Sequence, residues 1–156
     1  MWPELREEIE LELAMLREHV DSISPLLGRC ALGPPDLVET MALGAFLHGF
    51  YNGIENAFKR ISIHVDGGPP TGQAWHQELL ESMTRPNVNR PPVISANLAA
   101  LLQGYLDFRH VFRHLYSYRL DWERMAELVR TCRDVLGQLE GELNLFLKVP
   151  KDERNK

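Results

Sequence analysis

The sequence predicts an all-α protein, a bundle of four long helices and one short helix. Apolar residues recur three and four positions apart through four long segments, which is the spacing of one helix face. Runs rich in proline and glycine separate these segments and predict loops. No segment alternates apolar and polar residues, as a half-buried strand would. Helices that each bury one apolar face pack together as a bundle.

The first helix is expected over about residues 3–24. Pro3 suits the first helical position, because its missing N–H is not needed there, and acidic residues after it suit the positive end of the helix dipole. Gly28 and the Gly33–Pro35 run are expected to break this helix.

The second helix is expected from Pro35–Asp36 to about Ile63. It carries Ala45, Gly49 and Gly53, each four positions apart, although glycine inside a helix costs roughly 1 kcal/mol against alanine. Such a strip lets another helix approach closely. Packing within one chain and contact between subunits are both open at this point, and packing within the chain is favoured.

The second half of the chain predicts three further helices. Ser95 and Asp121 are placed to cap the last two of them, because short polar side chains accept hydrogen bonds from free N–H groups at helix starts. The three helices are expected over about residues 73–84, 94–118 and 122–147.

Length and composition predict a single domain over residues 1–150, followed by a charged tail over 151–156. The hydrophobic content of 44% and charged content of 25% are typical of a globular protein. A net charge of −5 argues against general nucleic-acid binding through surface charge. Cys30 and Cys132 have no metal-ligand spacing, and we expect reduced thiols in a cytoplasmic protein. No apolar run is long enough to span a membrane.

The segment most informative about function is an R-x4-H-x-Y pattern near the end of the fourth expected helix. It places a permanent cation, a group that titrates near neutral pH and a phenol within about two helical turns. These groups suit phosphodiester chemistry without a metal. The pattern consists of Arg109, His114 and Tyr116.

On an ideal helix the polar residues of this segment share one arc, with Arg109 and His114 about 140° apart on its two rims. The arc also holds His110, Arg113 and Ser117, whereas Phe108, Val111, Phe112, Leu115 and Tyr118 should face the core. Tyr116 should lie beside Arg109, at the edge of the core. A solvated helix face is one interpretation. The absence of Glu and Lys from the arc, and the position of Leu102 and Leu106 on it, favour a cleft or subunit interface.

Other chemistry fits the sequence less well. His110 and His114 are four apart and can pair on a metal, but further ligands are not evident and no Glu-x-x-His occurs, so we predict no metal. No nucleophile motif or glycine-rich phosphate loop is present. The remaining histidines are interpreted as ordinary surface or boundary residues: His19, His48, His64 and His76.

The segment from Arg109 to Tyr116 resembles the motif of the HEPN superfamily, and within it the HepT-like toxins. The polar His110 directly after the arginine fits that motif. A second resemblance, to cyanobacterial-type HepT-like proteins, lies in F-Y-N-G-I-E-N-A-F-K-R-I, the D-G-G-P-P-T-G loop and W-H-Q-E-L-L. Together the likeness covers about residues 36–147 and implies a HEPN-like helical bundle.

The resemblance implies a metal-independent endoribonuclease that needs no cofactor and works as a homodimer with a shared cleft. His114 would be the general acid or base, and Arg109 would bind the phosphate and stabilise charge in the transition state. His110 and Arg113 would be candidates for additional phosphate or RNA binding. The products would be a 2′,3′-cyclic phosphate and a 5′-hydroxyl.

The resemblance also implies a type VII-like toxin–antitoxin system, whose partner is a small MNT-type nucleotidyltransferase antitoxin. In some pairs that partner transfers AMP to the motif tyrosine, which here is Tyr116. A non-catalytic helical dimer that binds nucleotide, RNA or a partner protein is the alternative. The sequence does not place Glu55 and Asn56, identify the RNA that is cut, or show whether this copy is active.

Overall fold

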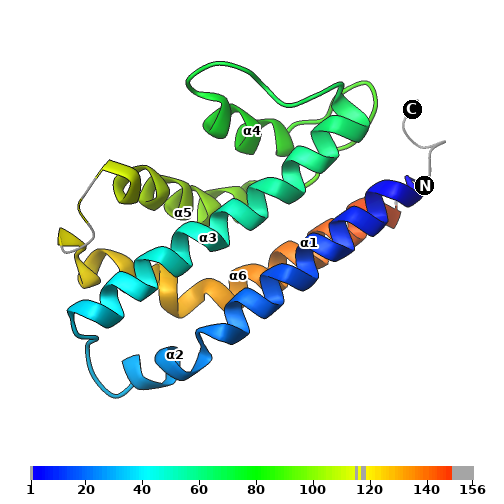
Figure 1. The fold of residues 1–156 in the computed structure, drawn as a ribbon. Coiled ribbons are helices and arrows are strands. Elements are labelled where there is room, and N and C mark those ends of the chain that lie inside the picture. The colour runs from blue at the N-terminus through cyan, green and yellow to red at the C-terminus, as the bar shows by residue number, and fades with distance from the viewer. Residues whose placement is uncertain (1, 115, 117–118, 149–156) are drawn as a thin grey trace.

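The fold is a bundle of four long helices with a short helix laid across one side (Figure 1). The computed structural model describes residues 2–114, 116 and 119–148, and no strand occurs among these residues. The helices are α1 (Pro3–Ser22), α2 (Ser24–Cys30), α3 (Leu37–Ile61), the π-helical turn η1 (Ser62–Asp66), α4 (Trp75–Met83), α5 (Ala96–His114) and α6 (Trp122–Lys148).

Helix α3 lies at the centre, with α1 on one side and α4 and α5 on the other, while α6 packs against α1, α3 and α5 (Figure 1). Sequential long helices run antiparallel. Trp2 stacks on Phe146 with ring centroids 5.2 Å apart, which brings the start of α1 to the end of α6 and closes the ring of four. The core between them is apolar, as the helical spacing of the sequence predicts.

The predicted caps Ser95 and Asp121 are present, and α3 begins with a capping box that was not predicted. Asp36 and Glu39 form a capping box, in which each side chain accepts a hydrogen bond from the other residue's backbone N–H. Ser95 Oγ accepts from Leu98 N at 3.1 Å, and Asp121 Oδ1 accepts from Glu123 N at 3.1 Å. These bonds satisfy N–H groups that a helix leaves unpaired at its start, so the starts of α3, α5 and α6 are encoded locally.

Two predicted boundaries are wrong. The first helix ends at Ser22, because Pro25 cannot donate to the carbonyl four residues back, and a separate α2 then runs through Gly28. Gly28 therefore lies inside α2 and does not break a helix, although a break had been expected there. Helix α5 ends at His114 instead of residue 118, so Tyr116 lies beyond the helix.

The glycines of the small-residue strip pack within the chain. A Cβ at Gly53 would lie 2.6 Å from Leu16 Cδ2, and one at Gly49 would lie 3.0 Å from the His19 ring. Ala45 is exposed. The strip thus serves the close approach of α1 to α3, and its glycines give no support for a subunit contact.

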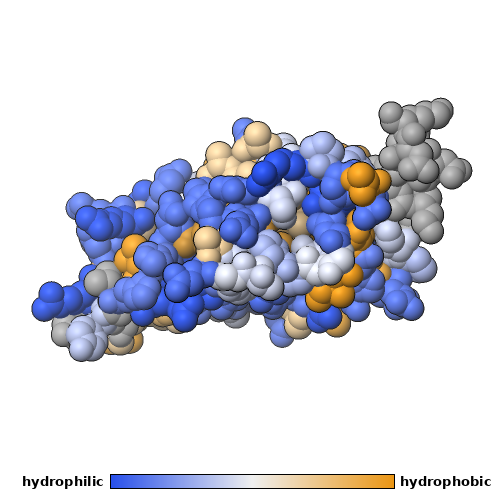
Figure 2. Space-filling model, turned by 90° about the horizontal axis from the view of Figure 1, so that it is seen from above, coloured by the Kyte–Doolittle hydropathy of each residue, from blue (hydrophilic) through white to orange (hydrophobic). Residues whose placement is uncertain are grey.

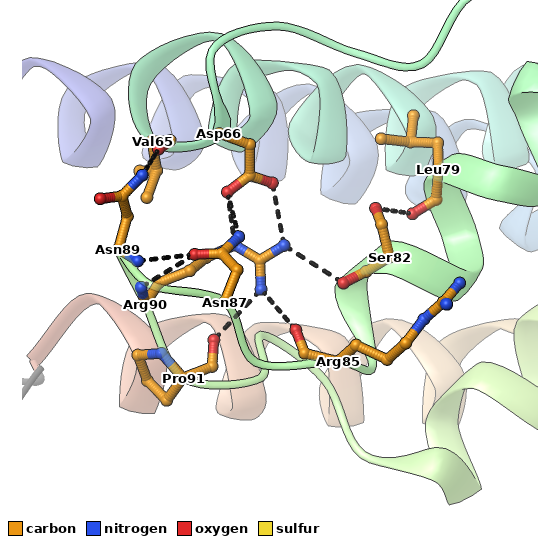
Figure 3. A network of polar contacts seen from close by, with 9 residues as sticks. All are labelled: Val65, Asp66, Leu79, Ser82, Arg85, Asn87, Asn89, Arg90 and Pro91. Carbon is orange, nitrogen blue, oxygen red and sulfur yellow. Dashed lines mark hydrogen bonds and ion pairs between the residues drawn. The ribbon is translucent and has the colours of Figure 1, made fainter. Parts of the chain in front are cut away.

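A buried ion pair fixes the segment that carries α4 (Figure 3). The Arg90 side chain is 1% exposed and donates to both carboxylate oxygens of Asp66 at 2.8 Å. Its remaining N–H groups donate to the carbonyl oxygens of Ser82, Arg85 and Pro91. The end of η1, the end of α4 and the loop before α5 are therefore held by one guanidinium, which positions α4 against α3 and α5.

Candidate functional site

The candidate site lies where α3, α4 and α5 meet, around the arginine of the motif. Tyr105 and Phe108 are buried on α5, and their burial sets the rotation of the helix. Arg109, the next residue after Phe108, is half-buried and turns toward α3 and α4. The helix therefore presents the motif arginine to its neighbours and not to open solvent.

Two side chains from neighbouring helices position the Arg109 guanidinium. Its Nε donates to Asn52 Oδ1 of α3 at 3.0 Å, and its Nη1 lies 3.4 Å from His76 Nε2 of α4. No ion pair within the described residues joins Arg109 to a carboxylate. The cation is thus oriented without direct neutralisation, which leaves its charge available to an anion.

His76 is in turn held by Glu55. Glu55 Oε2 lies 2.7 Å from His76 Nδ1, and the two side chains are 4% and 19% exposed. The His76 ring also contacts the ring of Trp75, with centroids 3.6 Å apart, and Lys59 Nζ lies 4.5 Å from the centroid of Trp75. The carboxylate of Glu55 on α3, the imidazole of His76 on α4 and the guanidinium of Arg109 on α5 therefore contact one another in succession.

His48 occupies the same side of α3, one turn before Asn52. Its Nδ1 is buried and has no hydrogen-bond partner among the described residues. Burial first, and then the positive charges of Arg109 and Arg113, lower the pKa of His48. The surroundings of His48 therefore disfavour its protonated form.

These contacts correct the interpretation of two histidines. His76 contacts Arg109 directly, and His48 lies close enough for the charge of Arg109 to lower its pKa, whereas His19 and His64 are paired elsewhere. Sequence reasoning missed this because α4 is short and its rotation is set by the clamp around Arg90. A usable signal did exist on α3, where four polar residues follow a helical spacing of four, three and four: His48, Asn52, Glu55 and Lys59.

The other residues of the motif segment lie apart from Arg109. His110, Arg113 and His114 are exposed, and the rings of His110 and His114 lie with centroids 4.6 Å apart. No hydrogen bond or ring contact joins His114 to Arg109 among the described residues. The side chains of His114 and Arg109 thus make no direct contact among the described residues.

The predicted helical arc holds in part. Leu102, Leu106 and Phe108 are buried and Phe112 is half-buried, but Val111 is 37% exposed and does not face the core. Because α5 ends at His114, the expected position of Tyr116 at the edge of the core is also wrong, and its side chain is 72% exposed. Leu115, Ser117 and Tyr118 lie outside the described residues.

Two further features of the described surface were candidates for a second site. A hollow of about 530 Å³ lies over the Arg90 clamp, where every N–H of that guanidinium already has an acceptor. Among the described residues, no three His, Cys, Asp or Glu side chains are grouped to hold a metal ion. The face seen in Figure 2 is largely hydrophilic with separate apolar patches.

Comparison with known families places this geometry in context. Residues 42–149, which include α4, the Arg109 cluster and the whole motif, match the model of a family described as HepT-like protein. The chain belongs to this family. Membership in this family indicates a HEPN toxin-like protein, as the resemblance of the motif predicts. The all-helical bundle agrees with this family. No curated protein and no solved structure matches the chain. None of the described helices is long and apolar enough to cross a membrane.

Proposed function

We propose that this HepT-like chain is a metal-independent endoribonuclease toxin that cleaves RNA by attack of a 2′-hydroxyl on the adjacent phosphate. The observation that carries the proposal is the Arg109 guanidinium, which Asn52 and His76 orient while no described carboxylate neutralises it. A guanidinium held in this way binds two phosphate oxygens through its planar edge and stabilises the charge that builds up during attack.

The proton transfers are assigned to the histidine of the motif. His114 is exposed at the end of α5 and can approach a bound phosphodiester. Because no described contact joins His114 to Arg109, we infer that the complete site forms on RNA that spans both residues or with a second copy of the chain. A homodimer with a shared cleft would provide that second copy. The exposed His110 and Arg113 would add contacts to neighbouring phosphates.

Tyr116 is the proposed point of control. Its 72% exposed side chain is accessible to another protein, and it lies two residues beyond His114. Transfer of AMP to its phenol by an MNT-type nucleotidyltransferase antitoxin would place an anion and a bulky base next to the site and block RNA. Purified chain treated with that enzyme and ATP should gain the mass of one AMP, and Tyr116→Phe should not.

The decisive test is RNA cleavage by purified, unmodified protein in EDTA. Cleavage should persist in the chelator and yield 2′,3′-cyclic phosphate ends. It should be lost in Arg109→Ala and His114→Ala but kept in Arg85→Ala and His64→Ala, which remove residues remote from α5. Activity that needs a divalent metal, or that survives both α5 substitutions, refutes the assignment.

A non-catalytic RNA-binding module is the second candidate. The separation of His114 from Arg109 within one chain favours it, because phosphate binding needs only the arginine. It predicts RNA binding that weakens with salt, through loss of the phosphate contacts, and no cleavage in the same samples.

A further inference from the structure

The contact between His76 and Arg109 defines which nitrogen of the imidazole carries a proton. A guanidinium has five N–H donors and no acceptor. The approach of Arg109 Nη1 to His76 Nε2 at 3.4 Å is therefore favourable only when Nε2 carries a lone pair. Nδ1 then carries the hydrogen and donates it to Glu55 Oε2 at 2.7 Å. The geometry favours the tautomer with the hydrogen on Nδ1 and the lone pair of Nε2 beside the motif arginine.

Glu55 makes this arrangement suited to accepting a proton. Its carboxylate side chain is 4% exposed, and its hydrogen bond fixes both the ring orientation and the tautomer of His76. When Nε2 gains a proton, the new imidazolium lies against that carboxylate, which offsets its charge. Contact with Trp75 restrains the ring from another side.

His76 differs from the other histidines near the surface. His64 is also paired with a glutamate, since its Nε2 lies 3.1 Å from Glu8 Oε2, but it is not part of the Arg109 cluster. His114 belongs to the motif, and no described hydrogen bond joins it to a carboxylate. His76 combines a buried carboxylate partner with contact to the presumed phosphate ligand, and its side chain is 19% exposed.

We propose that His76, oriented by Glu55, is the general base of the RNA cleavage reaction, and that His114 is the general acid. This inference rests on the proposed function. When Arg109 binds the phosphate, His76 Nε2 takes the proton of the 2′-hydroxyl as the 2′-oxygen forms its bond to phosphorus. The bond from phosphorus to the 5′-oxygen breaks, and that oxygen leaves with a proton from His114. The two imidazoles end in exchanged protonation states, and a solvent proton exchange resets them.

A substrate with sulfur in place of the bridging 5′-oxygen separates the two roles. A thiolate leaves without protonation, so His114→Ala should be slow on the oxygen substrate and close to the parent rate on the sulfur substrate. His76→Ala should be slow on both, because the 2′-hydroxyl must still lose its proton. Loss of one general acid–base group typically costs about 10²–10⁴-fold in rate. Glu55→Gln should slow both substrates by a smaller factor, and His64→Ala is the matched control.

Two further variants distinguish proton transfer from positioning. His76→Gln keeps a polar group that can accept from Arg109 but cannot take up a proton, so it should be as slow as His76→Ala. The cavity of His76→Gly should accept added imidazoles, and the restored rate should follow the pKa of the imidazole supplied. Circular dichroism and thermal unfolding of each variant check that the bundle is intact.

The outcomes separate the two proposals. If the parent cleaves RNA in EDTA and a folded His76→Gln cleaves at the parent rate, His76 is not the base and the nuclease assignment stands. If His114→Ala remains equally slow on the sulfur substrate, the division of roles is wrong. If the unmodified parent cleaves neither substrate, both the nuclease function and the role of His76 are refuted.

Discussion

Removing the carboxylate partner of Arg90 should destabilise the protein more than any exposed charge substitution. Asp66→Asn keeps the shape of the side chain but replaces one accepting oxygen with an NH2 group, which only donates. Asp66 Oδ1 accepts from Arg90 Nε at 2.8 Å and from Asn87 Nδ2 at 2.9 Å, while Oδ2 accepts from Arg90 Nη2 at 2.8 Å. Whichever way the amide turns, at least one N–H of Arg90 faces another donor.

The magnitude follows from burial. The Arg90 side chain is 1% exposed, so its charge would be left in the protein interior without a counter-ion. Removing one partner of a buried ion pair costs roughly 3–5 kcal/mol. Asp66 is 14% exposed and the asparagine keeps one accepting oxygen, so we expect the lower end, about 3 kcal/mol. With a urea dependence of about 2 kcal/mol per molar, the unfolding midpoint should fall by about 1.5 M.

Urea unfolding followed by far-UV circular dichroism measures this change. The matched control is Asp21→Asn, which makes the same substitution in the Arg133 pair, where the side chains are 72% and 52% exposed. Exposed pairs contribute about 0–1 kcal/mol, so the midpoint of the control should hardly move. Equal effects of the two substitutions would show that the Arg90 clamp does not stabilise the fold as argued here.

Three other predictions concern packing, pH and thiol reactivity. Gly53→Ala should lower the free energy of unfolding by about 1–2 kcal/mol, because the added Cβ clashes with α1. Gly137→Ala has open space around it and should raise the free energy of unfolding by about 0.5–1 kcal/mol. Urea midpoints of the two variants that move in the same direction would contradict this. Because the folded state lowers the pKa of His48, its contribution is complete above the ordinary histidine pKa and declines as the pH falls through that value toward the folded pKa. His48→Phe should therefore reduce the stability lost between about pH 7 and 5, and an unchanged loss would count against the assignment. Burial raises the pKa of both thiols, and Cys132 is 0% exposed, so a thiol reagent should modify Cys30 first and Cys132 only on unfolding, as mass spectrometry of the labelled protein would show.

Much of the bundle was predictable because its signals are local. Helical spacing of apolar residues identified the four long helices and α4, and the predicted caps Ser95 and Asp121 fixed where the last two helices begin. The end of α5 was not predictable from periodicity, because the apolar pattern continues past His114 while the helix does not. Similarly, α2 continues through Gly28 because one glycine costs a helix only about 1 kcal/mol.

The candidate site was predictable only where the chemistry lies on one helix. The motif identified Arg109 because arginine, histidine and tyrosine are close in sequence. Its partners come from α3 and α4, 57 and 33 residues away from it in the chain, and their meeting depends on how the helices pack. Periodicity shows that Asn52 and Glu55 share a side of α3 but not which helix faces that side. His76 could not be assigned without the rotation of α4.

The acidic net charge does not conflict with the proposed anion site on α5, because several acidic residues lie beside other arginines. Among the described residues, seven arginines form ion pairs with carboxylates: Arg17, Arg29, Arg60, Arg85, Arg90, Arg124 and Arg133. None of these pairs includes Arg109 or Arg113, and the charges of both lower the pKa of His48. The charges of Arg109 and Arg113 therefore act on their surroundings although the net charge of the protein is −5. Among the described residues no carboxylate forms an ion pair with Arg109, which distinguishes this proposed phosphate ligand from a structural arginine such as Arg90, and the two residues should respond oppositely to substitution. Loss of Arg109 should reduce RNA affinity with little change in stability, whereas loss of Arg90 should destabilise the fold.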